Sequence, residues 1–332
     1  MAQRTVTSNR SGTRALRRVA HDYLRRTERC LATPALSDDG VHDARLALKR
    51  SRTALRLLRP ALGAIRYQRE NAALRDAGHA LNAVRDASVL VGTLESLRES
   101  DRRLRDSRAA AELARELQGA QSAARHRLRT HQFLEPLRRS ARGCERRSRR
   151  WPVGRHGWSV IGPALRRIYG LGRRAMPASD AVAADGALHE WRKQVTYLRY
   201  ALQILAPIQP GPLGRLVRRA KALSDQLGEA HDLAVLARHI RAGTGTPALP
   251  GRGAAHRGRG ASRSGDGVAH TGNGAAHSGN GADLRELLVA IERRRVRLAR
   301  EALAAGRVLY RAPPRAFARR IGRAWQQWRK TG

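Results

Sequence analysis

A segment of 20 residues occurs twice in this chain, at residues 41–60 and again at residues 188–207. The two copies align without a gap, and each contains a histidine followed by an acid, arginines in register and a closing proline. In both copies the apolar residues recur at intervals of three and four, which is the spacing of one face of an α-helix. Because such a face must be buried, the repeat predicts two amphipathic helices that pack into a helical core.

Each predicted helix carries its cations on the face opposite the apolar one. On a helical wheel, the cationic face of the first copy falls within an arc of roughly 80° and contains His42, Arg45, Lys49, Arg52 and Arg56. The matching face of the second copy contains His189, Arg192, Lys193 and Arg199. Like charges at i,i+3 and i,i+4 destabilise a free helix, so an anionic ligand explains these faces better than ordinary solvation.

A second, shorter segment also occurs twice, at residues 81–90 and 227–236. The offset between its copies is 146 residues and that of the longer segment is 147, so the order and spacing of the two motifs are kept. This indicates an internal duplication. Strand patterns with a period of two are lacking, and the predicted fold is therefore all-α, with two pseudo-symmetric four-helix bundles.

Changes in composition predict the boundaries between parts of the chain. Residues 243–281 are mainly Gly, Ala, His, Ser and Arg, which bury too little apolar surface to offset the entropy of ordering. We predict a disordered insert there. Its histidines could bind a metal, but a low-complexity expansion is the better explanation, so no metal site is predicted. The predicted parts are a flexible tail (1–12), a first half (13–150), a connection (151–157) and a second half containing the insert (158–330).

The charge of the chain predicts its class of partner. Lys and Arg total 66 against 27 acids, which gives a formal net charge of +39. Such an excess implies a polyanionic partner, and the planar fork of arginine suits phosphate. With only 5 Trp, 6 Tyr and 2 Phe, the chain has few platforms on which bases could stack. Non-specific binding of RNA or DNA is therefore the alternative to a phosphate polymer without bases.

Other classes of protein fit the sequence poorly. Two cysteines do not make a disulfide scaffold, which favours a cytoplasmic location. No apolar run is long enough to span a membrane, so no membrane span is predicted. His-Asp doublets occur, but neither a phosphate-binding G-x-x-x-x-G-K-[ST] loop nor a G-x-S-x-G elbow accompanies them. We expect a binding protein without catalysis and without a cofactor.

The pattern H-x-x-R-x-x-x-K-R-x-R-x-x-L at 42–55, with H-x-x-R-K and L-R-Y-A-L between 189 and 202, resembles the CHAD family, the conserved histidine α-helical domain. The resemblance covers most of the chain, residues 13–330. It implies paired helical bundles that bind inorganic polyphosphate, with partner enzymes of polyphosphate metabolism and polyphosphate granules as the expected surroundings. The second copy departs from the family pattern at Thr196 and Tyr197.

The resemblance also assigns ligand-binding roles to individual residues. It implies that polyphosphate is bound by His42, Arg45, Lys49, Arg52, His189, Arg192, Lys193 and Arg199. Three further cations are predicted to contribute from their helical positions alone: Arg56, Arg85 and Lys221.

Overall fold

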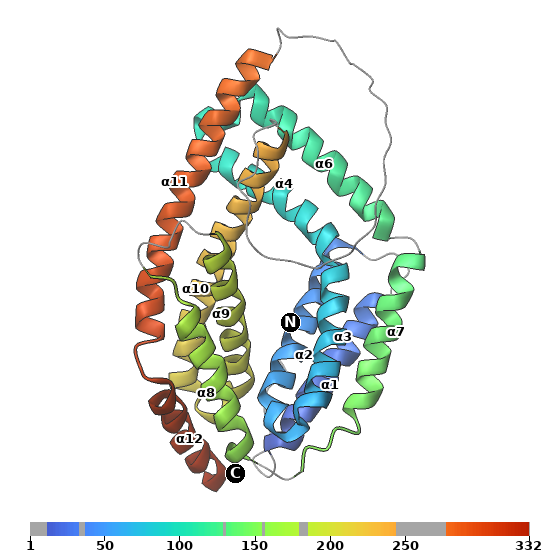
Figure 1. Cartoon of the computed structure of the whole chain (residues 1–332), viewed down its shortest axis with the longest axis vertical. Helices are drawn as coiled ribbons and strands as arrows, with labels where there is room; N and C mark the ends of the chain where they lie inside the picture. Colours follow the sequence, from blue (N-terminus) through green and yellow to red (C-terminus); the bar gives the residue numbers. More distant parts are fainter. Residues whose placement is uncertain are drawn as a thin grey trace, which may run out of the picture.

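The structure is a computed structural model that describes residues 12–32, 37–128, 131–154, 157–178, 185–243 and 277–331. Within these ranges the chain forms helices and no β-strand, which confirms the all-α prediction (Figure 1). The helices are α1 (Gly12–Ala32), α2 (Asp38–Leu62), α3 (Ala64–Ala80), α4 (Asn82–Ser100), α5 (Arg102–Asp106), α6 (Arg108–Leu128), α7 (His131–Ser148), α8 (Trp158–Ala175), α9 (Asp185–Leu205), the short 3₁₀ helix η2 (Ala206–Ile208), α10 (Pro210–Gly243), α11 (His277–Leu309) and α12 (Pro314–Thr331).

The two repeated segments form α2 and α9, and both bury the face that the periodicity predicts. In α2 the buried side chains include Ala44, Leu48, Leu55 and Leu58. In α9 they include Trp191, Val195, Leu198, Leu202 and Leu205. Burial of these apolar faces, rather than helix propensity alone, accounts for the stability of both helices.

The ends of α2 follow from local chemistry. The hydroxyl of Ser37 accepts a hydrogen bond from the Gly40 amide (3.1 Å), and two aspartates in the first turn favour the positive end of the helix dipole. The helix does not end at Pro60, which lies inside its last turn. It ends at Leu62, and the capping residue Gly63 that follows has a φ of 76°, which suits glycine.

Helices from distant parts of the chain pack side by side. In Figure 1, α1, α2, α3 and α7 form one group, while α8, α9 and α12 with parts of α10 and α11 form another. The α4 and α6 helices extend away from the first group and pack against the far parts of α10 and α11. As a result, a second hydrophobic core combines Leu94 and Leu117 with Leu236 and Ile291. Both hydrophobic cores therefore draw side chains from both predicted halves of the chain.

Three predicted boundaries differ from those in the structure, and one of them is the start of the predicted insert, because α10 includes Gly243. The α1 helix already includes Gly12, and the rest of the predicted tail lies outside the described residues. The α11 helix begins at His277 and so takes residues 277–281 of the predicted insert. Residues 244–276 of that insert also lie outside the described residues. Among the helices that are described, none combines the length and apolarity needed to cross a bilayer.

Candidate functional site

Side chains from five helices line one cleft, which we call the Lys49 cleft. Its cavity volume is about 510 Å³, and its walls come from α2, α4, α9, α10 and α11. Five of the lining residues are cations: Lys49, Arg85, Arg192, Arg199 and Arg294. Three are acids: Asp225, Glu229 and Asp232. The two repeated helices, which contact each other, thus bring their cationic faces to a single cavity.

Burial, with a further contribution from neighbouring positive charges, lowers the pKa values of several cations at this site. Enclosure by the surrounding protein, together with the charges of Arg45 and Arg192, lowers the pKa of Lys49 to about 8. The Lys49 side chain is nevertheless accessible to solvent, so its charge can reach a ligand. Burial likewise lowers the pKa of Arg45 to about 10 and lowers that of Arg192. A bound anion would relieve this repulsion, because a nearby negative charge favours the charged form of each group.

Protein contacts orient the arginines at this site. Arg45 donates to the Leu81 carbonyl (3.0 Å) and to the side chain of Asn82, at the break between α3 and α4. Arg192 lies 3.7 Å from a carboxylate oxygen of Asp232. A guanidinium carries five N–H donors, so each of these contacts leaves donors for a ligand. Arg45 lies beside the cleft rather than among the residues that line it.

The histidine pair at this site is not the pair that the repeat suggests. The ring of His189 faces His231, with the two Nδ1 atoms 3.4 Å apart and the ring centroids 4.8 Å apart. Burial and nearby cations lower the pKa of His189 and lower that of His231 to about 3. His231 is therefore neutral at physiological pH. His42 is exposed on the first part of α2 and does not line the Lys49 cleft.

Two of the predicted arginines gather around one tyrosine. The guanidinium carbon of Arg56 lies 3.9 Å from the ring centroid of Tyr197, and that of Arg52 lies 5.7 Å away. Arg52 also donates through Nε to Asn71 (3.2 Å). Tyr197 is one of the positions where the second repeat departs from the family pattern, and here it provides an aromatic face for cation–π contacts. Arg56 itself lines a different cleft.

The remaining predicted cations lie outside the lining of the Lys49 cleft. Lys193 pairs with Glu190, one turn before it on α9. Lys221 is exposed and pairs with Asp225, which also lies 3.5 Å from Arg199. The residues predicted to bind polyphosphate thus fall into two groups. The structure brings Lys49, Arg85, Arg192 and Arg199 together in the cleft and leaves the others beside it or elsewhere.

Several lining residues were not predicted from the sequence. Arg294 reaches the cleft from α11, where it donates to Glu229 (2.6 Å) and to the Ser100 hydroxyl (3.1 Å). The α4 helix adds hydroxyl groups from Ser88, Thr93 and Ser96. Arg294 sits in a run of arginines without helical periodicity, so only its tertiary neighbours identify it.

The described residues contain no group of three or more His, Cys, Asp or Glu side chains placed to hold a metal ion. The acids of the Lys49 cleft face cations instead, as the pairing of Arg192 with Asp232 shows. Burial raises the pKa of Asp232 although Arg192 lies nearby. The chemistry that this set of groups can provide is binding of an anion by hydrogen-bond donors and positive charge.

Comparison with known proteins reveals similarity both to a protein family and to solved structures. The family model for the CHAD domain matches residues 14–241. A crystal structure of the CHAD domain from the plant Ricinus communis is similar in fold, with a TM-score of 0.53, 18% sequence identity, and coverage of 74% of this chain and 84% of that one. None of the curated proteins searched matches the chain significantly. The family match spans α2, α4, α9 and nearly all of α10, which are four of the five helices that line the cleft.

Proposed function

We propose that this chain, which belongs to the CHAD domain family, binds inorganic polyphosphate in the Lys49 cleft. The family is associated with polyphosphate binding in general. The observation that carries the proposal is the gathering of cations from both repeated helices in one cavity, where they outnumber the acids. A chain of phosphates would supply the negative charge that this cavity lacks.

The chemistry of the cleft matches that of a linear polyphosphate. Such a polymer carries negative charge along its whole length and has no base to be recognised. The arginines offer pairs of N–H donors that match phosphate oxygens, and Lys49 offers a mobile point charge. The hydroxyl groups of Thr93 and Ser96 on α4 add neutral polar groups to the cleft. These groups sit on helices, which hold them in place before the ligand arrives.

Nucleic acid is the alternative ligand, and the cleft favours it less. Among the residues that line the Lys49 cleft, the single aromatic is Tyr200, which is buried. Bases would find no exposed ring on which to stack. We further propose that the chain binds polyphosphate without cleaving it, and that enzymes of polyphosphate metabolism and polyphosphate granules are its partners.

A competition experiment tests this proposal. Labelled long-chain polyphosphate is bound at fixed moderate salt and challenged with single-stranded RNA, duplex DNA and heparin at equal charge concentration. We expect polyphosphate to be preferred by at least about tenfold, or about 1.4 kcal/mol, and its chain length to be unchanged after incubation. Competition by RNA, DNA and heparin as strong as that by unlabelled polyphosphate would contradict the proposal and favour general polyanion binding.

The affinity for polyphosphate is expected to fall as pH rises above about 8, since Lys49 has its pKa near that value in the free protein. Below this pH Lys49 is protonated both free and bound, so the affinity stays constant. A bound anion raises the pKa of Lys49, and above pH 8 binding therefore requires uptake of a proton. The charges facing Lys49 are those of Arg45, Arg85, Arg192 and Asp232.

Calorimetry in two buffers of different ionisation enthalpy measures this proton uptake. The control is Lys49→Arg, which keeps the positive charge to a much higher pH. This variant should bind polyphosphate equally well at about pH 7 and about pH 9. If the wild-type affinity does not change across this range, Lys49 is not part of the binding site.

A further inference from the structure

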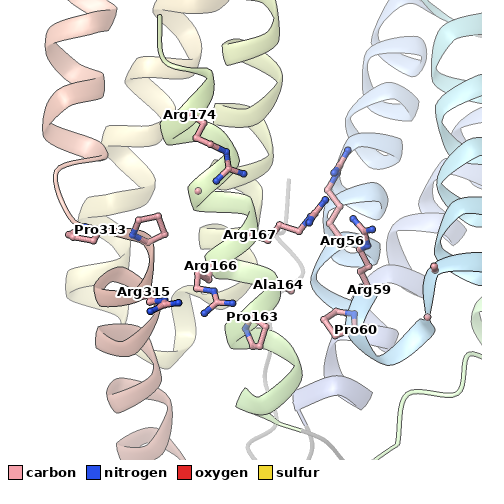
Figure 2. A pocket seen from close by; sticks show the side chains of 14 residues that line it. Arg56, Arg59, Pro60, Pro163, Ala164, Arg166, Arg167, Arg174, Pro313 and Arg315 are labelled. Atoms are coloured by element: carbon pink, nitrogen blue, oxygen red, sulfur yellow. The ribbon is translucent and has the colours of Figure 1, made fainter. Parts of the chain in front are cut away.

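A second cleft lies between α2, α8 and the start of α12, with a cavity volume of about 810 Å³. We call it the arginine cleft after its six lining arginines: Arg56, Arg59, Arg166, Arg167, Arg174 and Arg315. Figure 2 shows Arg167 extending from α8 toward Arg56 on α2, with Arg315 beside Arg166. Three helices thus direct guanidinium groups into one cavity.

The composition of this cleft is unusually simple. All its lining residues are arginine, proline, alanine or glycine, and within the described chain no carboxylate faces it. Several arginines elsewhere in the structure pair with acids, as Arg147 does with the buried Glu70 (2.8 Å) and Arg26 does with Asp43 (2.8 Å). Six arginines without a lining acid repel one another, and this cost is difficult to explain as a purely structural feature.

Contacts with aromatic rings hold two of these arginines in place. Arg56 lies over Tyr197, and the guanidinium carbon of Arg59 lies 4.8 Å from the ring centroid of Tyr67. The buried Nε of Arg56 has no hydrogen-bond partner among the described residues. Both arginines are thus positioned by ring faces, which leave their N–H donors available.

These groups define the chemical class of the ligand. Guanidinium is the only side-chain group in the cleft that can recognise a ligand, so the ligand must be an anion with several closely spaced negative charges. No aromatic residue lines the cleft, which leaves a nucleobase without a stacking partner. Prolines from α2, α8 and α12 line the rest of the cavity and restrict the backbone there. A phosphate polymer without bases meets all of these conditions.

The α2 helix connects the two clefts. Lys49 lines the first and Arg56 the second, with Arg52 between them on the same helical face. At 1.5 Å per residue the separation along the helix is about 10 Å. We propose that the arginine cleft is a second polyphosphate-binding site, and that one long chain follows α2 and occupies both clefts. This inference rests on the proposed function of the Lys49 cleft and adds selection for long chains.

The family match covers part of the arginine cleft but not all of it. Five of the six lining arginines fall within the matched residues 14–241, whereas Arg315 on α12 lies beyond them. The helical wheel of the repeated segments likewise selects Arg56 but has no basis for selecting the arginines of α8 and α12. The second site is therefore a property of how this chain folds.

Calorimetry with tripolyphosphate and with long-chain polyphosphate tests the second site. The wild type is expected to bind two tripolyphosphate molecules per chain, one in each cleft. The variant Arg166→Ala/Arg167→Ala/Arg315→Ala should bind one, and it should lose about 100-fold in affinity for the long chain, as expected when one of two linked sites is removed. The three arginines are exposed, so helicity and the melting temperature should show that the variant folds.

The matched control is Arg319→Ala/Arg323→Ala/Arg329→Ala, which removes three exposed arginines of α12 that do not line the cleft. It should lose less than about threefold, as exposed charges usually do. Equal losses in both variants, or two tripolyphosphates bound by the arginine-cleft variant, would overturn the second site. Neither result affects the proposed function, which is judged by variants of the Lys49 cleft.

Discussion

The variant Lys49→Ala/Arg192→Ala is expected to bind long-chain polyphosphate at least about 100-fold more weakly than the wild type, because it removes two charged contacts that contribute about 1.5–3 kcal/mol each. The two residues come from the two repeated helices and line the same cleft. Each contact with phosphate also displaces counterions. The slope of log affinity against log salt concentration should therefore decrease by about 1 to 2, measured as binding at several salt concentrations.

The control for this variant removes the same charge from a distant surface. Arg329→Ala/Lys330→Ala changes one arginine and one lysine, both exposed at the end of α12. We expect it to bind within about threefold of the wild type. If the two double variants lose the same affinity, the net charge of the chain determines binding and the Lys49 cleft has no special role.

Trp191→Ala is expected to lower the free energy of unfolding by about 3–5 kcal/mol, the usual cost of truncating a large buried aromatic. Trp191 is fully buried on α9, directly before Arg192. Its indole occupies the space beside Gly306 of α11, where an added Cβ would come within 2.5 Å of the ring. Removing the indole leaves a cavity between α9 and α11 that these backbones cannot readily close. Urea denaturation measures the loss.

Two further tryptophan variants separate the cavity from other effects. Trp191→Phe refills most of the space and removes an indole N–H that has no hydrogen-bond partner among the described residues, so its loss should be clearly smaller. Trp328→Ala makes the same substitution at a half-buried position of α12 and should also cost less. If Trp191→Ala unfolds at the same urea concentration as the wild type, the contact of α9 with α11 does not stabilise the fold.

The repeated segments were the most informative part of the sequence. Their period predicted that Leu48 and Leu55 of α2, and Trp191 and Leu198 of α9, would be buried, and all four are. The same period places Lys49 and Arg192 on the charged side of their helices, opposite the apolar side. These two charged sides meet at the Lys49 cleft. Helical periodicity is a local property of the backbone, so it can be read without knowledge of neighbouring helices.

The family resemblance was also confirmed, since the CHAD domain model matches residues 14–241. The fold class followed from the lack of strand patterns, and no strand occurs in the described ranges. The internal duplication and the roles of individual site residues stay predictions. They concern ancestry and ligand contacts, and neither can be derived from a helical arrangement alone.

The helices that meet at each cationic face are set by long-range packing. A helical wheel predicts that Lys49 and Arg56 share a face, but α4 and α10 adjoin one end of that face and α8 and α12 adjoin the other. For the same reason Arg294 could not be found from its sequence neighbours, and His189 pairs with His231 rather than with His42. Which side of each helix is apolar and which is charged follows from the amino-acid order, because it depends on local spacing. The partners of each side depend on packing between residues far apart in the chain.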